Sequence, residues 1–338
     1  MKISLPLPEL SRDRLNLYAR LGVEAVSVPW HYSTEFTDRS PKPLVPPAAR
    51  GAGDIQPDPP DVDELRRICD RIRHYDLHPR STSLPISRAI LTGAPDSAAD
   101  LDKLQRTLEV IGTAGITVAT TNFTALRASE GYSSRDDGRG SATVRDFDAA
   151  RIDTLPPLDD IGVHTRQQMW ERLERFLHAA VPAAEAAGVV MAMHPNDPPV
   201  PVFRGVGQPL IDFADMCRLV ECVDSPANSI YYDCGVATEW GEDAAKVADW
   251  FASRGRIAAA HIRSVQIEEA GRRYTECFLD EGDNDVPACL RALHGAGYAG
   301  CIDPDHTPGF SGDDVGMTMG WAWAVGTLRA YRNQVTAA

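Results

Sequence analysis

Eight short apolar runs alternate with longer amphipathic segments along the chain, and this alternation limits the fold more than any other feature. Each run has the length of a buried strand, and the intervening segments repeat apolar residues every three or four positions, as helices packed on a sheet do. Several segments end in glycine just before the next run, which is a common helix C-terminal signal. The runs are KISLP, EAVSVPW, HPRSTSLP, TVATTNFTA, VVMAMHP, SIYYDCG, AAAHIRS and GCIDPDH.

A regular strand–helix alternation predicts an α/β fold with a parallel sheet, and eight units favour a closed (β/α)8 barrel, the TIM barrel. No GxGxxG motif follows the first run, which argues against an open dinucleotide-binding sheet. We expect a single domain over residues 1–338. Long insertions are predicted on two strand-to-helix connections, at residues 31–60 after the second strand and 127–160 after the fourth. Loops of this length are usually lids or disordered segments.

The composition excludes several classes of partner. The chain has 48 acidic and 34 basic side chains and a formal net charge of −14, which predicts neither a nucleic-acid nor an anionic-membrane partner. No run approaches the roughly 18 apolar residues of a membrane span, and the N-terminus lacks the apolar core of a signal peptide. The seven cysteines form no CxxC pair, so we expect buried thiols in a reducing cytoplasm.

Four runs in the second half of the chain end on residues that can bind a metal ion. Because the C-terminal ends of barrel strands meet at one rim, where active sites lie, these side chains should come together. Two imidazoles and two carboxylates suit Mn²⁺, Fe²⁺, Co²⁺ or Zn²⁺ better than Ca²⁺, which prefers an all-oxygen shell. The predicted ligands are His194, Asp233, His261 and Asp305.

Each of these residues also has a structural interpretation. A single histidine is more often a hydrogen-bonded structural residue than a ligand, Asp233 could belong to a surface turn, and Asp305 could cap a helix. Independent structural residues, however, have no reason to recur at the same position of four successive units. The joint pattern therefore favours a metal site.

Three further charged residues are candidates for the chemistry. His306 follows Asp305 and could carry protons at neutral pH, although it could also cap the last helix. Arg263 lies two residues beyond His261, so strand alternation aims both to one side, where the guanidinium could clamp a substrate carboxylate. The acidic stretch 274–285 has the composition of a solvated loop, although it contains Glu276 as another candidate.

At these residues the sequence resembles the mannonate dehydratase family. Its members are metal-dependent barrels of the xylose-isomerase-like superfamily that remove water from D-mannonate to give 2-keto-3-deoxy-D-gluconate. The similar segments occur in order over nearly the whole chain, and HPNDPP and PDH are quite specific. These segments are AGITVATTNFTA, GVVMAMHPNDPPVPVFRGVGQPL, VDSPANSIYYDCG, AAHIRSV, YTECFLDEGDND and GCIDPDHTPG.

The resemblance implies one divalent metal ion, with Mn²⁺ first and Fe²⁺, Co²⁺ or Zn²⁺ as alternatives. It implies ligands at His194, His261 and Asp305, with His306 as a catalytic acid or base. We expect Arg263 to act beside it in the reaction. Five polar residues within the similar segments are predicted to bind substrate. These are Asn122, Asp197, Arg204, Glu276 and Asp303.

The chain also departs from the family pattern at three places. The ligand on the sixth strand is usually a cysteine, whereas an ungapped count from SPAN places Asp233 there and Cys234 one residue later. Alternation lets only one of the two point inward; we favour Asp233, as in many isomerases and epimerases of the superfamily, and keep Cys234 as the alternative. Asp303 stands where the family has an arginine, and VGMTMG lacks the expected tyrosine. These losses predict weak or absent activity on D-mannonate.

We therefore predict a metal-dependent hydro-lyase that acts on a sugar acid like D-mannonate. The alternatives are a metal-dependent sugar isomerase or epimerase of the same superfamily, which keeps the hydroxyl, and a catalytically silent sugar-acid-binding protein. The expected partner is a small sugar acid or polyol, and a homo-oligomer is one option for the assembly.

Overall fold

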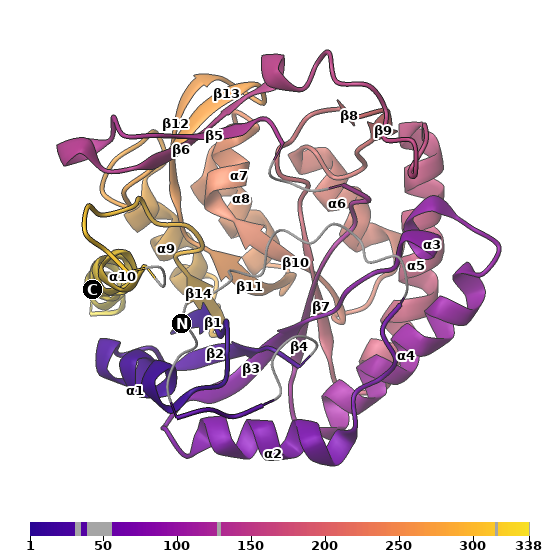
Figure 1. The fold of residues 1–338 in the computed structure, drawn as a ribbon, viewed down its shortest axis with the longest axis horizontal. Helices are drawn as coiled ribbons and strands as arrows, with labels where there is room; N and C mark the ends of the chain where they lie inside the picture. Colours follow the sequence, from indigo (N-terminus) through magenta and orange to yellow (C-terminus); the bar gives the residue numbers. More distant parts are fainter. Residues whose placement is uncertain (31–34, 39–55, 127–129, 315–316, 338) are drawn as a thin grey trace.

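The computed structural model describes residues 1–30, 35–38, 56–126, 130–314 and 317–337. Its centre is a closed barrel of eight parallel strands, and each apolar run of the sequence overlaps one of them (Figure 1). The predicted TIM barrel is therefore confirmed. In barrel order the strands are β1 (Lys2–Pro6), β14 (Cys301–Asp303), β11 (Ile257–His261), β10 (Asn228–Asp233), β7 (Val190–His194), β4 (Val118–Asn122), β3 (His78–Ser83) and β2 (Ala25–Val28).

Helices surround the barrel on its outer side (Figure 1). Their ends follow local signals of the sequence: Thr165 and Gln168 form a capping box that begins α5, and Gly22, with φ 80°, ends α1. The helices are α1 (Arg12–Leu21), α2 (Val62–Arg73), α3 (Arg88–Thr92), α4 (Ser97–Thr113), α5 (Arg166–Ala186), α6 (Phe213–Cys222), α7 (Cys234–Glu239), α8 (Ala244–Ala252), α9 (Val286–Gly295) and α10 (Thr318–Thr336). In the described part of the chain, no helix is long and apolar enough to cross a membrane.

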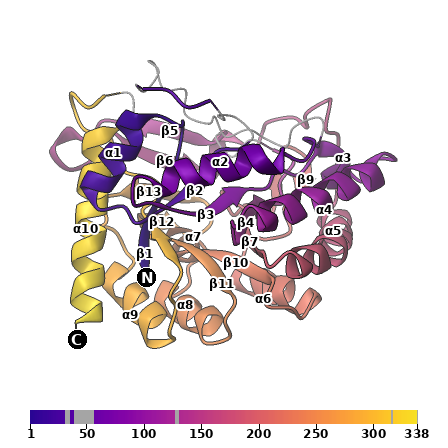
Figure 2. The same ribbon diagram turned by 90° about the horizontal axis from the view of Figure 1, so that it is seen from below.

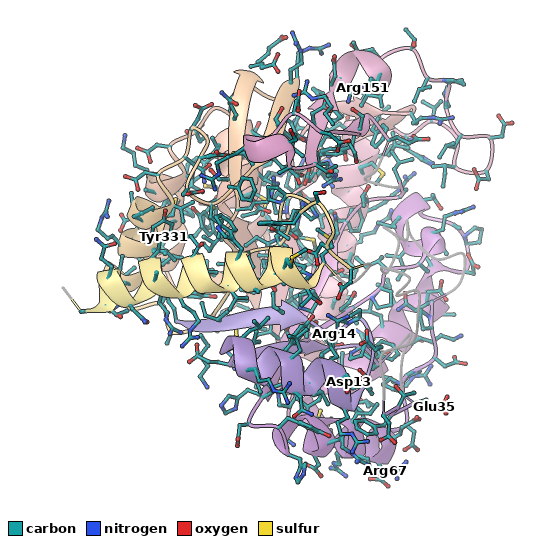
Figure 3. All side chains as sticks on the ribbon, turned by 60° about the vertical axis from the view of Figure 1, so that its left-hand side comes forward. Asp13, Arg14, Glu35, Arg67, Arg151 and Tyr331 are labelled. Carbon is teal, nitrogen blue, oxygen red and sulfur yellow. The ribbon has the colours of Figure 1, made fainter. Side chains whose placement is uncertain are left out.

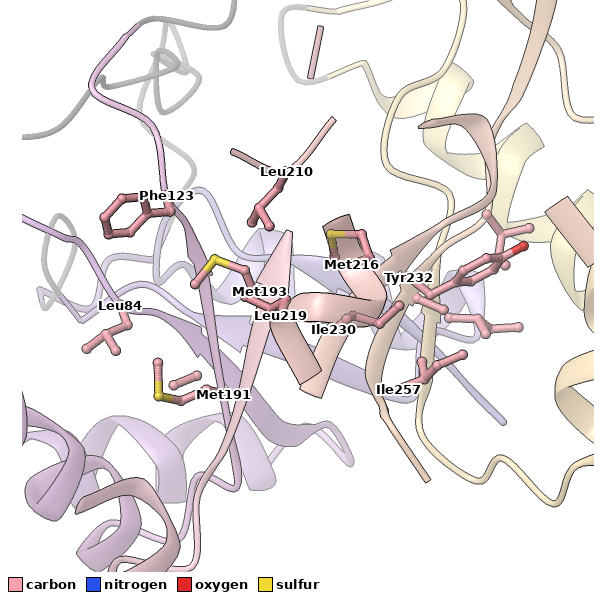
Figure 4. Packing of buried hydrophobic residues seen from close by; sticks show 14 of the residues in the cluster. Leu84, Phe123, Met191, Met193, Leu210, Met216, Leu219, Ile230, Tyr232 and Ile257 are labelled. Carbon is pink, nitrogen blue, oxygen red and sulfur yellow. The ribbon is translucent and has the colours of Figure 1, made fainter. Parts of the chain in front are cut away.

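Alternation along the strands separates two packed regions. On β7, Met191 and Met193 belong to the large core between barrel and helices, where Figure 4 shows them with Ile230 of β10 and Leu219 of α6. Ala192, between the two methionines, packs inside the barrel with Val118 and Ala258. The same alternation continues to the end of β7, so the next residue, His194, points inward at the rim.

The insertion after β4 folds as part of an antiparallel sheet. Its strands β5 (Tyr132–Arg135) and β6 (Val144–Asp148) pair with β12 (Ser264–Glu269) and β13 (Arg273–Cys277), which follow β11, in the order β12-β13-β6-β5. Figure 2 shows this sheet at one end of the barrel. In the described part of this insertion, strands thus stand where the sequence predicts a lid or a disordered loop. The pairing of β6 with β13 joins segments more than a hundred residues apart, so the local sequence carries no signal for it.

Smaller features secure this end of the molecule. The turn after β6 contains η2 (Ala149–Arg151), and Arg151, labelled in Figure 3, donates to the carbonyl oxygen of Gly131 at 2.9 Å. A short hairpin of β8 (Val202–Phe203) and β9 (Val206–Gly207) follows β7, and η1 (Arg139–Ser141) precedes β6. The insertion after β2 falls mostly at residues 31–34 and 39–55, outside the described residues.

Candidate metal centre and active site

Strand register places two of the predicted ligands, Asp233 and His261, side by side at the barrel rim. Asp233 of β10 stands opposite His261 of β11, and His261 stands opposite Asp303 of β14. On the other side, Asn122 of β4 pairs with His194 of β7. Parallel pairing fixes this level because residues in register lie side by side on neighbouring strands.

Three of the predicted ligands form a compact group of donor atoms. Nε2 of His194 lies 3.2 Å from Nδ1 of His261, and both nitrogens approach Oδ2 of Asp233, at 3.4 and 3.3 Å. Metal–ligand bonds of about 2.0–2.2 Å in tetrahedral geometry place neighbouring ligand atoms roughly 3.4 Å apart. The three atoms therefore have the spacing of ligands around one divalent ion, and in the described residues they form a group that could hold one.

Within this trio (His194, Asp233 and His261), the hydrogen bond of His194 and the charge of Asp233 suit a metal. Nδ1 of His194 donates to the carbonyl oxygen of Pro195 at 2.7 Å, which leaves a lone pair on Nε2 facing the trio. Burial would raise the pKa of Asp233, but the guanidinium of Arg263 and the two imidazoles hold it well below its usual range. The carboxylate is thus an anion, as a ligand must be.

Of the two alternatives on β10, the structure turns Asp233 toward the trio. Cys234 is fully buried, and its thiol donates to the carbonyl oxygen of Arg263 at 3.0 Å. Alternation also places Tyr231 on the inner side with Asp233. Its ring centroid lies 4.0 Å from that of His261 and 5.5 Å from that of His194, so Tyr231 supports both imidazoles from below. Sequence reasoning missed Tyr231, although its position two residues before Asp233 was a sufficient signal.

Asp305, the fourth predicted ligand, lies beside the trio but not in it. Its Oδ1 is 3.5 Å from Nε2 of His261, on the side of the ring away from Asp233. Asp305 adopts a left-handed φ of 55°, and its Oδ2 faces Arg263 at 3.4 Å and His306 at 3.3 Å. In this geometry Asp305 is placed as an outer carboxylate that orients a metal-binding histidine.

Arg263 lies at the centre of a ring of carboxylates. The side chain is 2% exposed. All five partners lie within 3.7 Å of a guanidinium nitrogen; they are Glu239 at 2.8 Å, Asp233 at 3.1 Å, Asp197 at 3.2 Å, Asp305 at 3.4 Å and Glu276 at 3.7 Å. Each guanidinium nitrogen already faces a protein carboxylate, so the geometry favours a positioning role over the predicted clamp on substrate.

Gly235 makes room for this buried arginine. A Cβ atom at Gly235 would lie 2.7 Å from Cγ of Arg263 and 2.8 Å from its Cζ. We expect Gly235→Ala to lower the free energy of unfolding by about 1–3 kcal/mol, the usual cost of overpacking. Urea denaturation measures this change. The matched control is Gly326→Ala in α10, where a Cβ meets nothing within 4 Å; an equal loss in both variants would contradict the explanation.

A second group of side chains lies beyond Asp305. The carboxylate of Glu276 accepts from Nη1 of Arg145 at 2.9 Å through Oε1, and its Oε2 lies 2.9 Å from Nδ1 of His306. Burial opposes a charge on His306, but Asp305 and Glu276 outweigh it and raise its pKa to about 9. Burial likewise opposes the charge on Glu276, whereas His306 and Arg145 lower its pKa to about 2. Glu276 thus bridges two cations.

These groups face a cavity of about 300 Å³ between the barrel rim and the sheet of the insertion. Asp305 and His306 contribute one wall together with residues 307–309, and Arg145 and Glu276 contribute the other. The volume is at the lower end of the range for pockets that bind small molecules, roughly 300–1,000 Å³. Glu276 is 5% exposed on β13, so the stretch with a loop-like composition contains a buried carboxylate at the site.

The remaining predicted substrate-binding residues differ in their surroundings. Oδ1 of Asn122 is buried and has no hydrogen-bond partner among the described residues, so a ligand could use it. Asp197 contacts Arg263 and accepts from the hydroxyl of Tyr132. Arg204 instead donates to Glu130 at 2.8 Å and to the carbonyl oxygen of Pro156 at 2.7 Å, and thereby joins two loops.

Asp303, the residue in the place of the family's arginine, is buried at the end of β14. Its Oδ1 accepts from the backbone N–H of Asp305 at 2.8 Å, and Asp303 does not line the cavity. Burial raises its pKa to about 7. Asp303 therefore supports the turn that carries Asp305 and His306.

Comparisons with known proteins find similarity to mannonate dehydratases. The sequence model of the family described as D-mannonate dehydratase (UxuA) matches residues 158–323. Mannonate dehydratase 1 of Bacillus licheniformis is 26% identical over 309 residues, which cover 78% of this chain and 82% of that protein.

Solved structures give the same picture of the fold. The crystal structure of mannonate dehydratase from Streptococcus suis serotype 2 superposes with a TM-score of 0.79 at 20% identity, covering 99% of this chain and 95% of that one. An L-ribulose 3-epimerase superposes with a TM-score of 0.57 at 15% identity, covering 99% and 96% of the two chains.

Proposed function

We propose that this chain, which is similar to the mannonate dehydratases in sequence and in fold, is a hydro-lyase acting on a sugar acid. One observation carries the proposal. Asp305 joins the trio to His306, since it lies 3.5 Å from His261 and 3.3 Å from His306 at the wall of one cavity. We infer that a small molecule in this cavity would reach both His306 and, beside Asp305, a metal held by the trio.

His194, Asp233 and His261 would hold the metal ion, and Asp305, predicted as a fourth ligand, would orient His261 from outside the trio. A mixed imidazole and carboxylate set suits Mn²⁺ first, with Fe²⁺, Co²⁺ or Zn²⁺ as alternatives. When bound, a divalent ion polarises the carboxylate of a sugar acid and makes the hydrogen at C2 more acidic.

His306 is the residue that we assign to proton transfer. Its Nδ1 faces the carboxylates of Glu276 and Asp305, which stabilise the imidazolium and fix the ring, so Nε2 remains to deliver a proton. That proton goes to the hydroxyl leaving C3. A general base takes the proton from C2, so the substrate has lost one water molecule, and the enol tautomerises to a 2-keto-3-deoxy acid. Arg263 acts by positioning Asp233 and Asp305, both of which it contacts.

A metal-dependent isomerase or epimerase is the second candidate. Asp233 at the sixth-strand position favours it, since many sugar isomerases and epimerases of the superfamily are expected to carry an aspartate there. The likeness to an L-ribulose 3-epimerase concerns the fold alone. Both reactions begin with loss of a hydrogen next to a polarised carbonyl or carboxylate, so the fate of the neighbouring hydroxyl distinguishes them.

The test is NMR of Mn²⁺-loaded protein with a panel of hexonates, including D-mannonate, in D₂O. Dehydration gives a new C3 signal with one solvent deuterium, whereas epimerisation incorporates deuterium without loss of hydroxyl. We expect D-mannonate to be a poor substrate among the acids of the panel, because Asp303 stands where the family is expected to have an arginine. If every sugar acid in the panel kept its C3 hydroxyl, the hydro-lyase proposal would be wrong.

The setting of the reaction follows from the cysteines and the charge. All seven cysteines are free thiols, which supports the predicted cytoplasmic location. The partner is a small sugar acid or polyol, and the acidic chain is not expected to bind nucleic acid or membrane.

A further inference from the structure

Arg145 presents a positive charge at the wall of the cavity. It lies on β6 opposite Glu276 of β13, and alternation places Tyr132 of β5 on the same face of the sheet. Cζ of Arg145 lies 3.6 Å from the centroid of the Tyr132 ring. A guanidinium stacked on an aromatic face and tied to a carboxylate has a fixed orientation, so it is prepared to bind before a ligand arrives.

Most hydrogen-bond donors of Arg145 remain available. Its contacts with Glu276 and His306 both use Nη1. Among the described residues, Nε and Nη2 have no acceptor, and the side chain is 29% exposed at the cavity. An arginine carries five N–H donors in a planar fork that matches the two oxygens of a carboxylate.

The other cations near the cavity are already engaged. Arg263 is surrounded by five carboxylates, and His306 faces Glu276 and Asp305. Among the other arginines of the insertion, Arg139 binds both carboxylate oxygens of Asp280, at 2.9 and 3.0 Å. Arg135 lies 3.3 Å from Asp137 and 3.6 Å from Asp146, on the opposite face of the sheet.

We propose that Arg145 binds the carboxylate of the substrate and so makes the site selective for sugar acids over uncharged polyols. This inference rests on the proposed function, because it assumes a sugar acid as ligand. The position expected from the family for such an arginine holds Asp303, which does not line the cavity. In this chain the anion-binding group therefore comes from the insertion sheet and not from a barrel strand.

The experiment compares affinities for an acid and for its uncharged analogue. Calorimetry of the Mn²⁺-loaded protein measures Kd for D-mannonate, D-gluconate and D-galactonate and for the alditols that lack their carboxylates. For the acid bound most tightly, Arg145→Gln should weaken binding about 10- to 100-fold, the usual effect of losing a charge-assisted hydrogen bond. Alditol affinity should stay within about twofold. Arg145→Lys keeps the charge but lacks the planar fork of donors. Its affinity for the acid should lie between those of the wild type and Arg145→Gln.

Arg135→Gln is the matched control, since it removes the same charge from the same sheet on the face away from the cavity. It should leave both affinities unchanged. If Arg145→Gln binds the acid as the wild type does, or loses acid and alditol equally, the inference fails while the hydro-lyase proposal stands. A wild-type protein without any preference for acids also overturns it. If Arg145→Gln selectively loses acid binding but the wild type forms no 3-deoxy product, the role of Arg145 is supported and the hydro-lyase proposal is wrong.

Discussion

His261→Ala is expected to remove most of the bound metal and nearly all turnover while the barrel stays folded. Nδ1 of His261 lies within 3.3 Å of both other members of the trio, and Nε2 lies 3.5 Å from Asp305, so this ring connects every predicted ligand. Loss of an outer partner of a metal ligand commonly costs about 10- to 100-fold in metal affinity. Loss of a ligand should cost at least as much. Elemental analysis after dialysis, with circular dichroism for the fold, measures the effect.

Three further variants make this result specific. His294→Ala replaces an exposed histidine of α9 and should keep the full metal content. Cys234→Ser should also keep it, because the thiol is bound to the carbonyl oxygen of Arg263. Asp305→Asn should weaken metal binding less than Asp233→Asn does if Asp305 orients His261 from outside. A fully loaded His261→Ala protein would show that the trio is not the metal site.

His306→Asn should reduce kcat by about 10²- to 10⁴-fold, the usual contribution of a general acid or base. Asparagine keeps a polar group beside Glu276 but cannot carry the proton. Because Asp305 lies between His306 and the trio, the metal content and the fold should change little. Steady-state kinetics on the best substrate of the hexonate panel measures the loss.

His178→Asn in α5 is the control, since it removes an exposed imidazole from a helix outside the cavity. Its kcat should equal that of the wild type. A near-normal kcat of the His306→Asn protein would show that His306 has only a structural role beside Glu276. A protein that loses metal as well would show that His306 helps to hold the ion.

Much of the barrel could be predicted because its signals are local. Apolar runs marked all eight strands, several of them with a glycine just before, and the parallel arrangement then brought their last residues together. Alternation also limited the choice on β10, since Tyr231 and Asp233 share a face that Cys234 cannot join. Those inferences used only the period of a strand and the direction of the chain.

The parts that could not be predicted depend on contacts between distant segments. Strand alternation correctly predicted that the side chain of Arg263 points toward the site. The sequence pattern does not show, however, that five carboxylates from different elements surround it. Glu276 lies in a strongly acidic stretch, and its burial follows from pairing with Arg145, 131 residues away. Arg204 belongs to a matching segment, yet its partners are Glu130 and Pro156. The partners and the burial of such side chains depend on tertiary contacts.

The sheet of β5, β6, β12 and β13 forms one wall of the cavity, and this wall can change separately from the barrel rim. The trio rests on β7, β10 and β11, whereas Arg145 and Glu276 stand on strands outside the barrel. A substitution in this sheet can alter which molecule fits without disturbing the ion, and one at the rim can alter the ion while the opposite wall stays intact. Under the proposed function, the barrel strands hold the reaction centre and the insertion sheet holds the residues that recognise the substrate. Substitutions in the sheet could therefore change the substrate while the reaction centre stays the same.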